Sequence, residues 1–125
     1  MERNGEAGES MGTFESMGTF APEAHFVYDA RLGIPTPHLQ REWQAFTAEE
    51  QSEILYYWET VRGRIPDRIF EFERDIVALQ NELEQEESFE KVCELTWEIA
   101  DRASRINDLN LYFRLNQDVA VKAHH

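Results

Sequence analysis

Two consecutive stretches of the chain carry side chains at alternating spacings of three and four residues, the pattern of helices that pack along one line. The first ladder is Ile65, Ile69, Phe72, Ile76, Leu79 and Leu83. The second is Phe89, Val92, Thr96, Ile99, Ala103, Ile106, Asn110 and Phe113. The segment between them, from Glu84 to Ser88, is too short for anything but an antiparallel connection. The spacing therefore predicts an all-α fold built on an antiparallel, coiled-coil-like helical hairpin.

The register of this hairpin follows from folding the chain about Glu87. Ile76 then faces Ile99, and the large ring of Phe72 falls opposite the small side chain of Ala103. At 1.5 Å per residue the second helix is longer than the first and overhangs it. We therefore expect its last turns to be covered by other parts of the chain or by a second subunit.

Five apolar residues of the predicted hairpin lie off the ladders or on this overhang, and aromatic side chains in such places are typical of a further contact. They are Trp97, Phe70, Leu111, Tyr112 and Leu115. Within one chain they would fill the core, and between two chains they would form a dimer interface. The sequence leaves both interpretations open, and we take these residues as interface candidates.

Two shorter helices are expected to brace the hairpin from its N-terminal side. Thr36 followed by Pro37 has the form of an N-cap and first helical position, and predicts a short helix through Leu39, Trp43 and Phe46. Thr47 with Glu50 has the form of a capping box. It predicts a second helix with one apolar face, formed by Ile54, Leu55, Trp58 and Val61. Gly63 and Pro66 then predict either a break or a kink.

The N-terminal third has a different composition. Residues 1–24 hold four of the six glycines and a direct repeat of Glu-Ser-Met-Gly-Thr-Phe at 9–14 and 15–20, and we expect a disordered acidic tail. Residues 25–37 predict an extended connector, because Pro35 and Pro37 exclude helix from the residues before them. This connector would be anchored by Phe26, Tyr28, Leu32 and Ile34. Residues 38–118 form the predicted helical domain, and 119–125 a C-terminal tail.

Charge and composition exclude several classes of function. The chain has 12 basic and 25 acidic residues, a net charge of −13, and residues 67–101 alone carry twelve acids and three bases. Direct binding to nucleic acid or to an anionic membrane is not expected from such a chain. The one cysteine, Cys93, cannot form an intrachain disulfide and is expected to be buried as a small apolar residue. These features predict a soluble cytoplasmic protein.

One pattern points to catalysis. Glu98 and Asp101 form an ExxD motif, and Glu84 with Glu87 forms an ExxE motif before it. This arrangement resembles the metal-binding pattern of all-α nucleoside triphosphate pyrophosphohydrolases. The resemblance implies four carboxylates that hold Mg²⁺ against phosphates. Because such motifs arise readily in an acidic chain, and these two are ten residues apart, a metal site is the alternative interpretation and our first expectation is that there is no cofactor.

The sequence favours a non-enzymatic protein–protein interaction or regulatory module over an enzyme. Strong packing signals occur without a recognisable catalytic cluster, and we expect a basic protein partner and a homodimer. The alternatives are a magnesium-dependent nucleotide hydrolase and an acidic mimic of nucleic acid that blocks a DNA- or RNA-binding protein.

Overall fold

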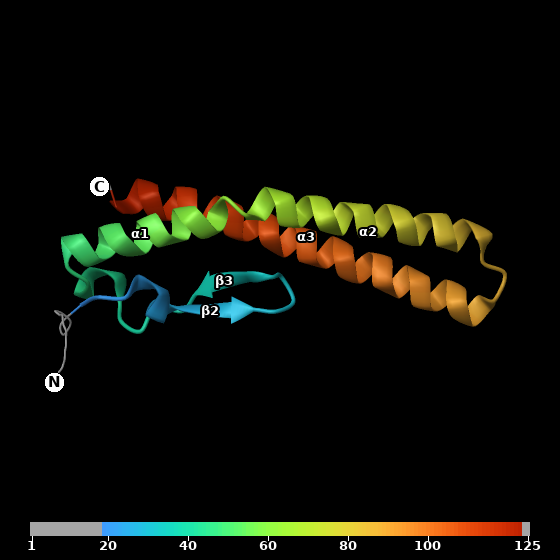
Figure 1. The fold of residues 1–125 in the computed structure, drawn as a ribbon, viewed down its shortest axis with the longest axis horizontal. Helices are drawn as coiled ribbons and strands as arrows, with labels where there is room; N and C mark the ends of the chain where they lie inside the picture. The colour runs from blue at the N-terminus through green and yellow to red at the C-terminus, as the bar shows by residue number, and fades with distance from the viewer. Residues whose placement is uncertain (1–18, 124–125) are drawn as a thin grey trace, which may run out of the picture.

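The structure, a computed structural model, describes residues 19–123, and the side chains of residues 19–115. It is mostly helical, as predicted, with one small sheet. In chain order the elements are the 3-10 helix η1 (Pro22–His25), strands β2 (Phe26–Asp29) and β3 (Ile34–Pro37), the 3-10 helix η2 (Trp43–Ala45), and helices α1 (Ala48–Arg62), α2 (Ile65–Gln85) and α3 (Phe89–Ala123). Figure 1 shows an elongated molecule in which α1 and the strands lie at one end.

Helix α1 begins at the predicted capping box. The Thr47 side chain accepts a hydrogen bond from the Glu50 backbone N–H, and the Glu50 carboxylate accepts one from the Thr47 N–H. At the other end, Gly63 and Arg64 interrupt the helix but keep right-handed backbone angles. Helix α2 therefore follows α1 with a change of direction, which Figure 1 shows as a bend.

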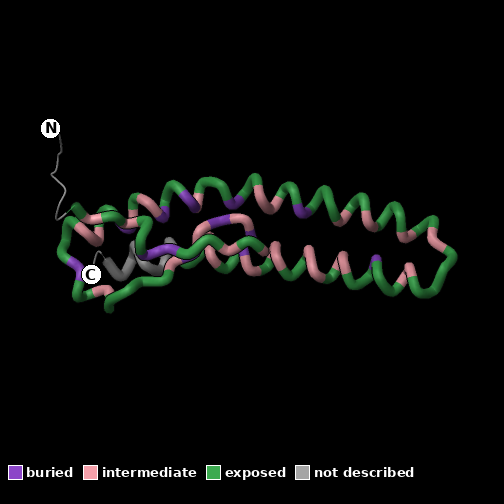
Figure 2. Tube along the Cα trace, turned by 60° about the horizontal axis from the view of Figure 1, so that its bottom comes forward, coloured by how far each residue is buried: buried purple, intermediate pink, exposed green. Residues whose placement is uncertain are grey.

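Helices α2 and α3 lie side by side and run in opposite directions, joined by a short turn (Figure 1); we call this pair the arm. Figure 2 shows that the more buried residues of the arm lie where its two helices face each other. All six ladder residues of α2 are buried or half-buried. On α3 the ladder was wrong at four of its eight positions, because the side chains of Phe89, Thr96, Ala103 and Asn110 are exposed.

Among the described side chains of α3, Leu95 and Leu109 are the fully buried ones, with exposed fractions of 1% and 0%. They lie on one stripe with Val92, Ile99 and Ile106 of the predicted ladder, and Arg102 is half-buried on the same stripe. The observed stripe therefore shares some positions with the predicted one and is rotated away from the others. Because Ala103 is exposed, the predicted packing of Phe72 on Ala103 is wrong. Instead, the guanidinium groups of Arg68 and Arg105 lie 4.5 and 5.6 Å from the centre of the Phe72 ring.

The predicted helix starting at Pro37 is wrong. Pro37 ends strand β3, which pairs antiparallel with β2, so that Phe26 lies opposite Pro37 and Val27 opposite Thr36. Thr36 does not cap a helix, because its buried hydroxyl donates to the backbone oxygen of Val27 at 3.2 Å. The predicted extended connector is thus a β-hairpin, and the helix expected after it is reduced to the single 3-10 turn η2.

The β-hairpin packs against the end of the molecule where α1 meets α3. Phe26 stacks on Trp58 with ring centres 6.1 Å apart, and Trp58 meets the edge of Tyr112 at the same distance. Of the predicted connector anchors, Phe26, Leu32 and Ile34 are buried, whereas Tyr28 is exposed. The main cluster of buried residues therefore joins the strands, α1 and the base of the arm.

Three further expectations concern the ends of the chain and the cysteine. The acidic tail lies mostly outside the described residues, but its last part is ordered: Phe20 packs against the core and η1 begins at Pro22. Helix α3 continues to Ala123, beyond the predicted boundary at residue 118. Cys93 is exposed, which contradicts the predicted burial.

None of the helices in the described part has the length and apolarity that crossing a bilayer needs.

Candidate interaction surfaces

The five predicted interface residues do not share one surface. Leu111, Tyr112 and Leu115 line a shallow hollow between the β-hairpin turn and the end of α3. Trp97 is 67% exposed and lines a different hollow farther along α3. Phe70 is 63% exposed and lies two residues, or roughly 200° of helix rotation, from Arg68, which faces the β-hairpin. Trp97 instead shares its hollow with Arg105, which donates to the backbone of the β-hairpin turn. Phe70 and Trp97 therefore lie on different sides of the arm.

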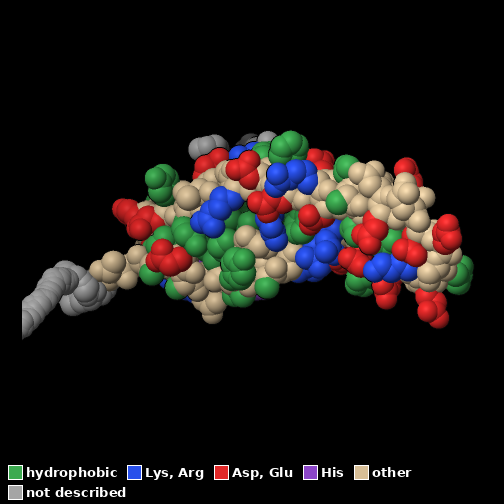
Figure 3. Space-filling view, turned by 45° about the vertical axis from the view of Figure 1, so that its right-hand side comes forward, with side chains coloured by type: hydrophobic (Ala, Val, Ile, Leu, Met, Phe, Trp, Pro, Cys, Tyr) green, Lys and Arg blue, Asp and Glu red, His purple; other side chains and the backbone are tan. Residues whose placement is uncertain are grey.

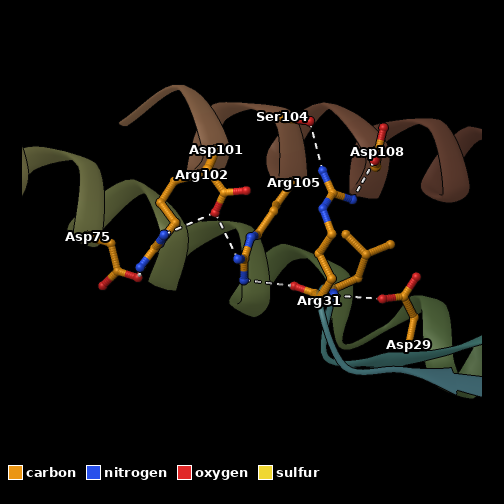
Figure 4. Close-up of polar contacts among 9 residues, drawn as sticks. Asp29, Arg31, Asp75, Asp101, Arg102, Ser104, Arg105 and Asp108 are labelled. Atoms are coloured by element: carbon orange, nitrogen blue, oxygen red, sulfur yellow. Dashed lines mark hydrogen bonds and ion pairs between the residues drawn. The ribbon is translucent and has the colours of Figure 1, made fainter. Parts of the chain in front are cut away.

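A network of arginines holds the β-hairpin turn on the arm (Figure 4). Arg31, in the turn, donates to Asp108 and to Ser104 of α3, both at 2.7 Å. Arg105 of α3 donates to the backbone oxygen of Arg31 at 3.2 Å. These contacts join residues more than seventy positions apart, so no local pattern in the sequence could indicate them. The network fixes the position of the turn and pairs the charge of Arg31 with that of Asp108.

On the α2 side the same turn is held through Gly33. This residue has φ of 78°, in the left-handed region that favours glycine. The Arg68 Nε donates to the backbone oxygen of Leu32 at 2.9 Å. A Cβ atom at position 33 would lie 2.4 Å from that Nε. Because Gly33 has no side chain, the Arg68 side chain has room to reach the backbone oxygen of Leu32.

The four carboxylates of the magnesium hypothesis are not gathered by the fold. Glu84 lies in the last turn of α2 and Glu87 in the turn that follows, whereas Glu98 lies about 14 Å along α3 from its first residue. Asp101 is already engaged, since one carboxylate oxygen lies 3.0 Å from Arg102 Nη1 and 2.8 Å from Arg105 Nη2. Within the part of the chain that the structure describes, no three His, Cys, Asp or Glu side chains converge as a metal site would require.

Replacing Asp101 with asparagine is expected to lower the free energy of unfolding by about 1–3 kcal/mol, because two half-buried arginines lose a charged partner. Chemical denaturation followed by circular dichroism measures the change. Asp75 provides the matched control: it is 3.8 Å from Arg102 and more exposed, so Asp75→Asn is expected to change stability by less than about 0.5 kcal/mol. Equal effects of the two substitutions would contradict the bridging role of Asp101.

The hydrophobic side chains on the face drawn in Figure 3 gather over the end that carries α1 and the strands, and acidic and basic side chains lie both there and along the arm. Three of the hollows on the described residues are lined by several charged side chains or by glutamates beside tyrosines. They offer little uninterrupted apolar area to a partner.

One hollow differs, and we call it the groove. It has a volume of about 450 Å³ and lies where the β-hairpin, η2, α1 and the end of α3 meet. Gln44 is the one polar residue among the described residues that line it; the others are Phe26, Pro37, Leu39, Trp43, Ile54, Leu55, Trp58 and Leu115. Sequence reasoning placed Leu55 and Trp58 on an apolar helix face but not in a groove, because the lining comes from four separate segments.

Trp58, which lines the groove, also has a buried polar atom without a hydrogen-bond partner in the described part of the chain. Trp58 is 3% exposed, and its Nε1–H is buried without a hydrogen-bond partner among the described residues. A buried donor of this kind lowers stability, and most buried tryptophans have a partner.

Comparison of the chain with protein-family models, with curated proteins and with solved structures finds no match.

Proposed function

We propose that the protein is a non-enzymatic interaction module of the cytoplasm, and that its groove binds the apolar side chains of a basic protein segment. The observation that carries this proposal is the lining of the groove, which is apolar at eight of its nine described positions. Small-molecule sites in proteins are typically concave, mostly apolar and of this size, and grooves that take the apolar face of a peptide helix are likewise hydrophobic. The half-buried ring of Trp43 is of the type that dominates the binding energy at protein interfaces.

Leu39 and Leu115 support this proposal from the rim of the groove. Their side chains are 37% and 38% exposed, so part of their apolar surface is in contact with water in the free protein. A partner that covered them would gain the free energy of removing that surface from water. An amphipathic helix, with apolar residues on one face, is one kind of segment that binds in a hydrophobic groove.

The net charge of −13 supports a basic partner over an acidic one. Opposite charges raise the rate at which two proteins meet and suppress binding of wrong partners, more than they raise final affinity. The coiled-coil-like arm, which carries twelve acids against three bases in residues 67–101, would supply most of this attraction. A homodimer would have to overcome the same charge as repulsion, and the dispersed positions of Phe70 and Trp97 give it less support.

The three tryptophans allow a direct test with synthetic peptides. Trp43 and Trp58 line the groove and Trp97 lies elsewhere, so the Trp97→Phe protein reports on the groove through its fluorescence. The probe is a helical 18-residue peptide with leucines on one face and lysines on the other. We expect a saturable change in tryptophan emission, and at least about tenfold weaker binding when Leu39→Glu is added, because a carboxylate would have to be desolvated at the rim.

Two controls accompany this titration. Val77 is exposed on the arm, so Val77→Glu adds the same charge outside the groove and should leave the affinity nearly unchanged. A peptide with glutamates in place of the lysines should bind more weakly, and the difference should shrink as salt is added. Emission that does not change with the lysine peptide, or an equal loss of affinity in the Leu39 and Val77 variants, would overturn the proposed use of the groove.

A further inference from the structure

Phe20, the last residue of the second hexapeptide copy, sits in an aromatic site that we call the niche. The niche is formed by the rings of His25 and Phe46. The Phe20 ring stacks on His25 with centres 5.5 Å apart and meets the edge of Phe46 at 6.1 Å. The two niche residues also contact each other, edge to face, at 5.0 Å. Phe20 is thereby half-buried against the core although it lies at the start of the described chain.

The niche is itself held firmly. His25 is buried, and its Nδ1 accepts a hydrogen bond from the Gln40 backbone N–H at 3.2 Å. The guanidinium of Arg41 lies 4.3 Å from the centre of the Phe46 ring, on which Trp43 also packs. The site that receives Phe20 is therefore built by residues 25–46 and does not depend on the hexapeptide for its own construction.

The chain contains a second segment with the same chemistry. Residues 9–14 repeat residues 15–20 at all six positions, so Phe14 is preceded by the same five residues as Phe20. The ring contacts that the niche makes with Phe20 can therefore also be made by Phe14. The two phenylalanines are six residues apart in the same chain, so their exchange is an intramolecular step over a tether of six residues.

We propose that the niche binds either of the two hexapeptide phenylalanines, and that Phe14 replaces Phe20 by a register shift of six residues. In the shifted register residues 15–20 form a loop. The apolar surface that Phe20 loses is regained by Phe14, so loop closure is the main difference between the registers. The length-dependent part of this penalty, which grows as the 3/2 power of loop length, disfavours the shifted register by roughly fifteen-fold for six residues.

A double-mutant cycle at the two phenylalanines tests this exchange, with the equilibrium constant for unfolding measured in urea. In Phe20→Ala the niche is taken over by Phe14, so the equilibrium constant for unfolding should rise roughly fifteen-fold. In Phe14→Ala the major register is untouched, and the constant should stay within about 10% of the wild type. With both residues replaced the niche is empty. The equilibrium constant for unfolding should then rise roughly a hundredfold, because the apolar and ring contacts are lost.

A fluorine label gives a second measurement that does not depend on stability. 4-Fluorophenylalanine is placed at position 14 or at position 20, one label per protein. In the Phe20→Ala background the resonance from position 14 should move to the shift of the label at position 20 in an otherwise wild-type chain. Dilution should not change it, because the exchange occurs within one chain.

Two outcomes would overturn the proposal. The first is an equal loss from Phe20→Ala with and without Phe14, together with an unmoved resonance at position 14. The second is a rescue that disappears on dilution, which would assign the niche of one molecule to the first copy of another molecule.

Discussion

Replacement of Trp58 by alanine is expected to lower the free energy of unfolding by about 3–5 kcal/mol, the largest effect of any single change considered for this chain. Trp58 is 3% exposed and packs against both Phe26 and Tyr112, so its removal leaves a cavity where the strands, α1 and α3 meet. Urea denaturation followed by far-ultraviolet circular dichroism measures the loss without depending on tryptophan emission.

Trp58→Phe separates the ring from its N–H. Phenylalanine keeps much of the apolar contact and removes the donor that has no partner among the described residues, so the loss should be less than about 1.5 kcal/mol. A loss below about 1 kcal/mol for the alanine variant would mean that Trp58 does not hold these elements together. An equal loss for the two variants would mean that ring volume is not the source of the stabilisation.

The second large effect is expected at Gly33, where alanine should lower the free energy of unfolding by about 2–4 kcal/mol. Part of this loss comes from a side chain at φ of 78°, which costs about 1–2 kcal/mol. The rest comes from Arg68, which the new Cβ displaces from its hydrogen bond to Leu32. Thermal and chemical unfolding of Gly33→Ala, compared with the wild type, measure the sum.

Gly63 is the matched control for this substitution. Its φ of −63° suits any residue, and a Cβ there would lie 3.5 Å from its nearest neighbour, the Thr60 oxygen. Gly63→Ala is therefore expected to be neutral or to stabilise by about 0.4–1 kcal/mol. If both glycine variants behaved alike, the left-handed turn and the Arg68 contact would not matter to stability.

The parts of the fold that depend on local sequence could be predicted. The capping box of Thr47 and Glu50 uses residues three positions apart, and both of its hydrogen bonds are present. The apolar ladder of α2 is also correct, because every member is an apolar residue on one face. On α3 the predicted ladder is wrong at half of its positions. It contains Thr96, Ala103 and Asn110, which are exposed, in place of Leu95, Arg102 and Leu109, which are buried or half-buried. The charged Arg102 interrupts the apolar stripe that the structure shows, so this stripe was not recognised.

The β-hairpin and the groove depend on distant contacts that a single sequence does not contain. Thr36 and Pro37 have the form of a helix start, but Thr36 is buried and bonded to Val27 of the opposite strand, and this pairing decides the local structure. The interface candidates were chosen for being apolar and off the ladders. Leu115 is the one among them that lines the groove, whose other walls come from segments tens of residues away.

The arm extends well past the turn of the β-hairpin, and there its two helices stand clear of the other elements (Figure 1). In this distal part each helix is covered by its partner alone, so the body neither supports it nor limits its reach. Since the ladder repeats every seven residues, one repeat can be removed from, or added to, each helix without changing any contact of the groove or the niche. The length of the arm can therefore change by whole heptads while the groove and the niche keep their geometry.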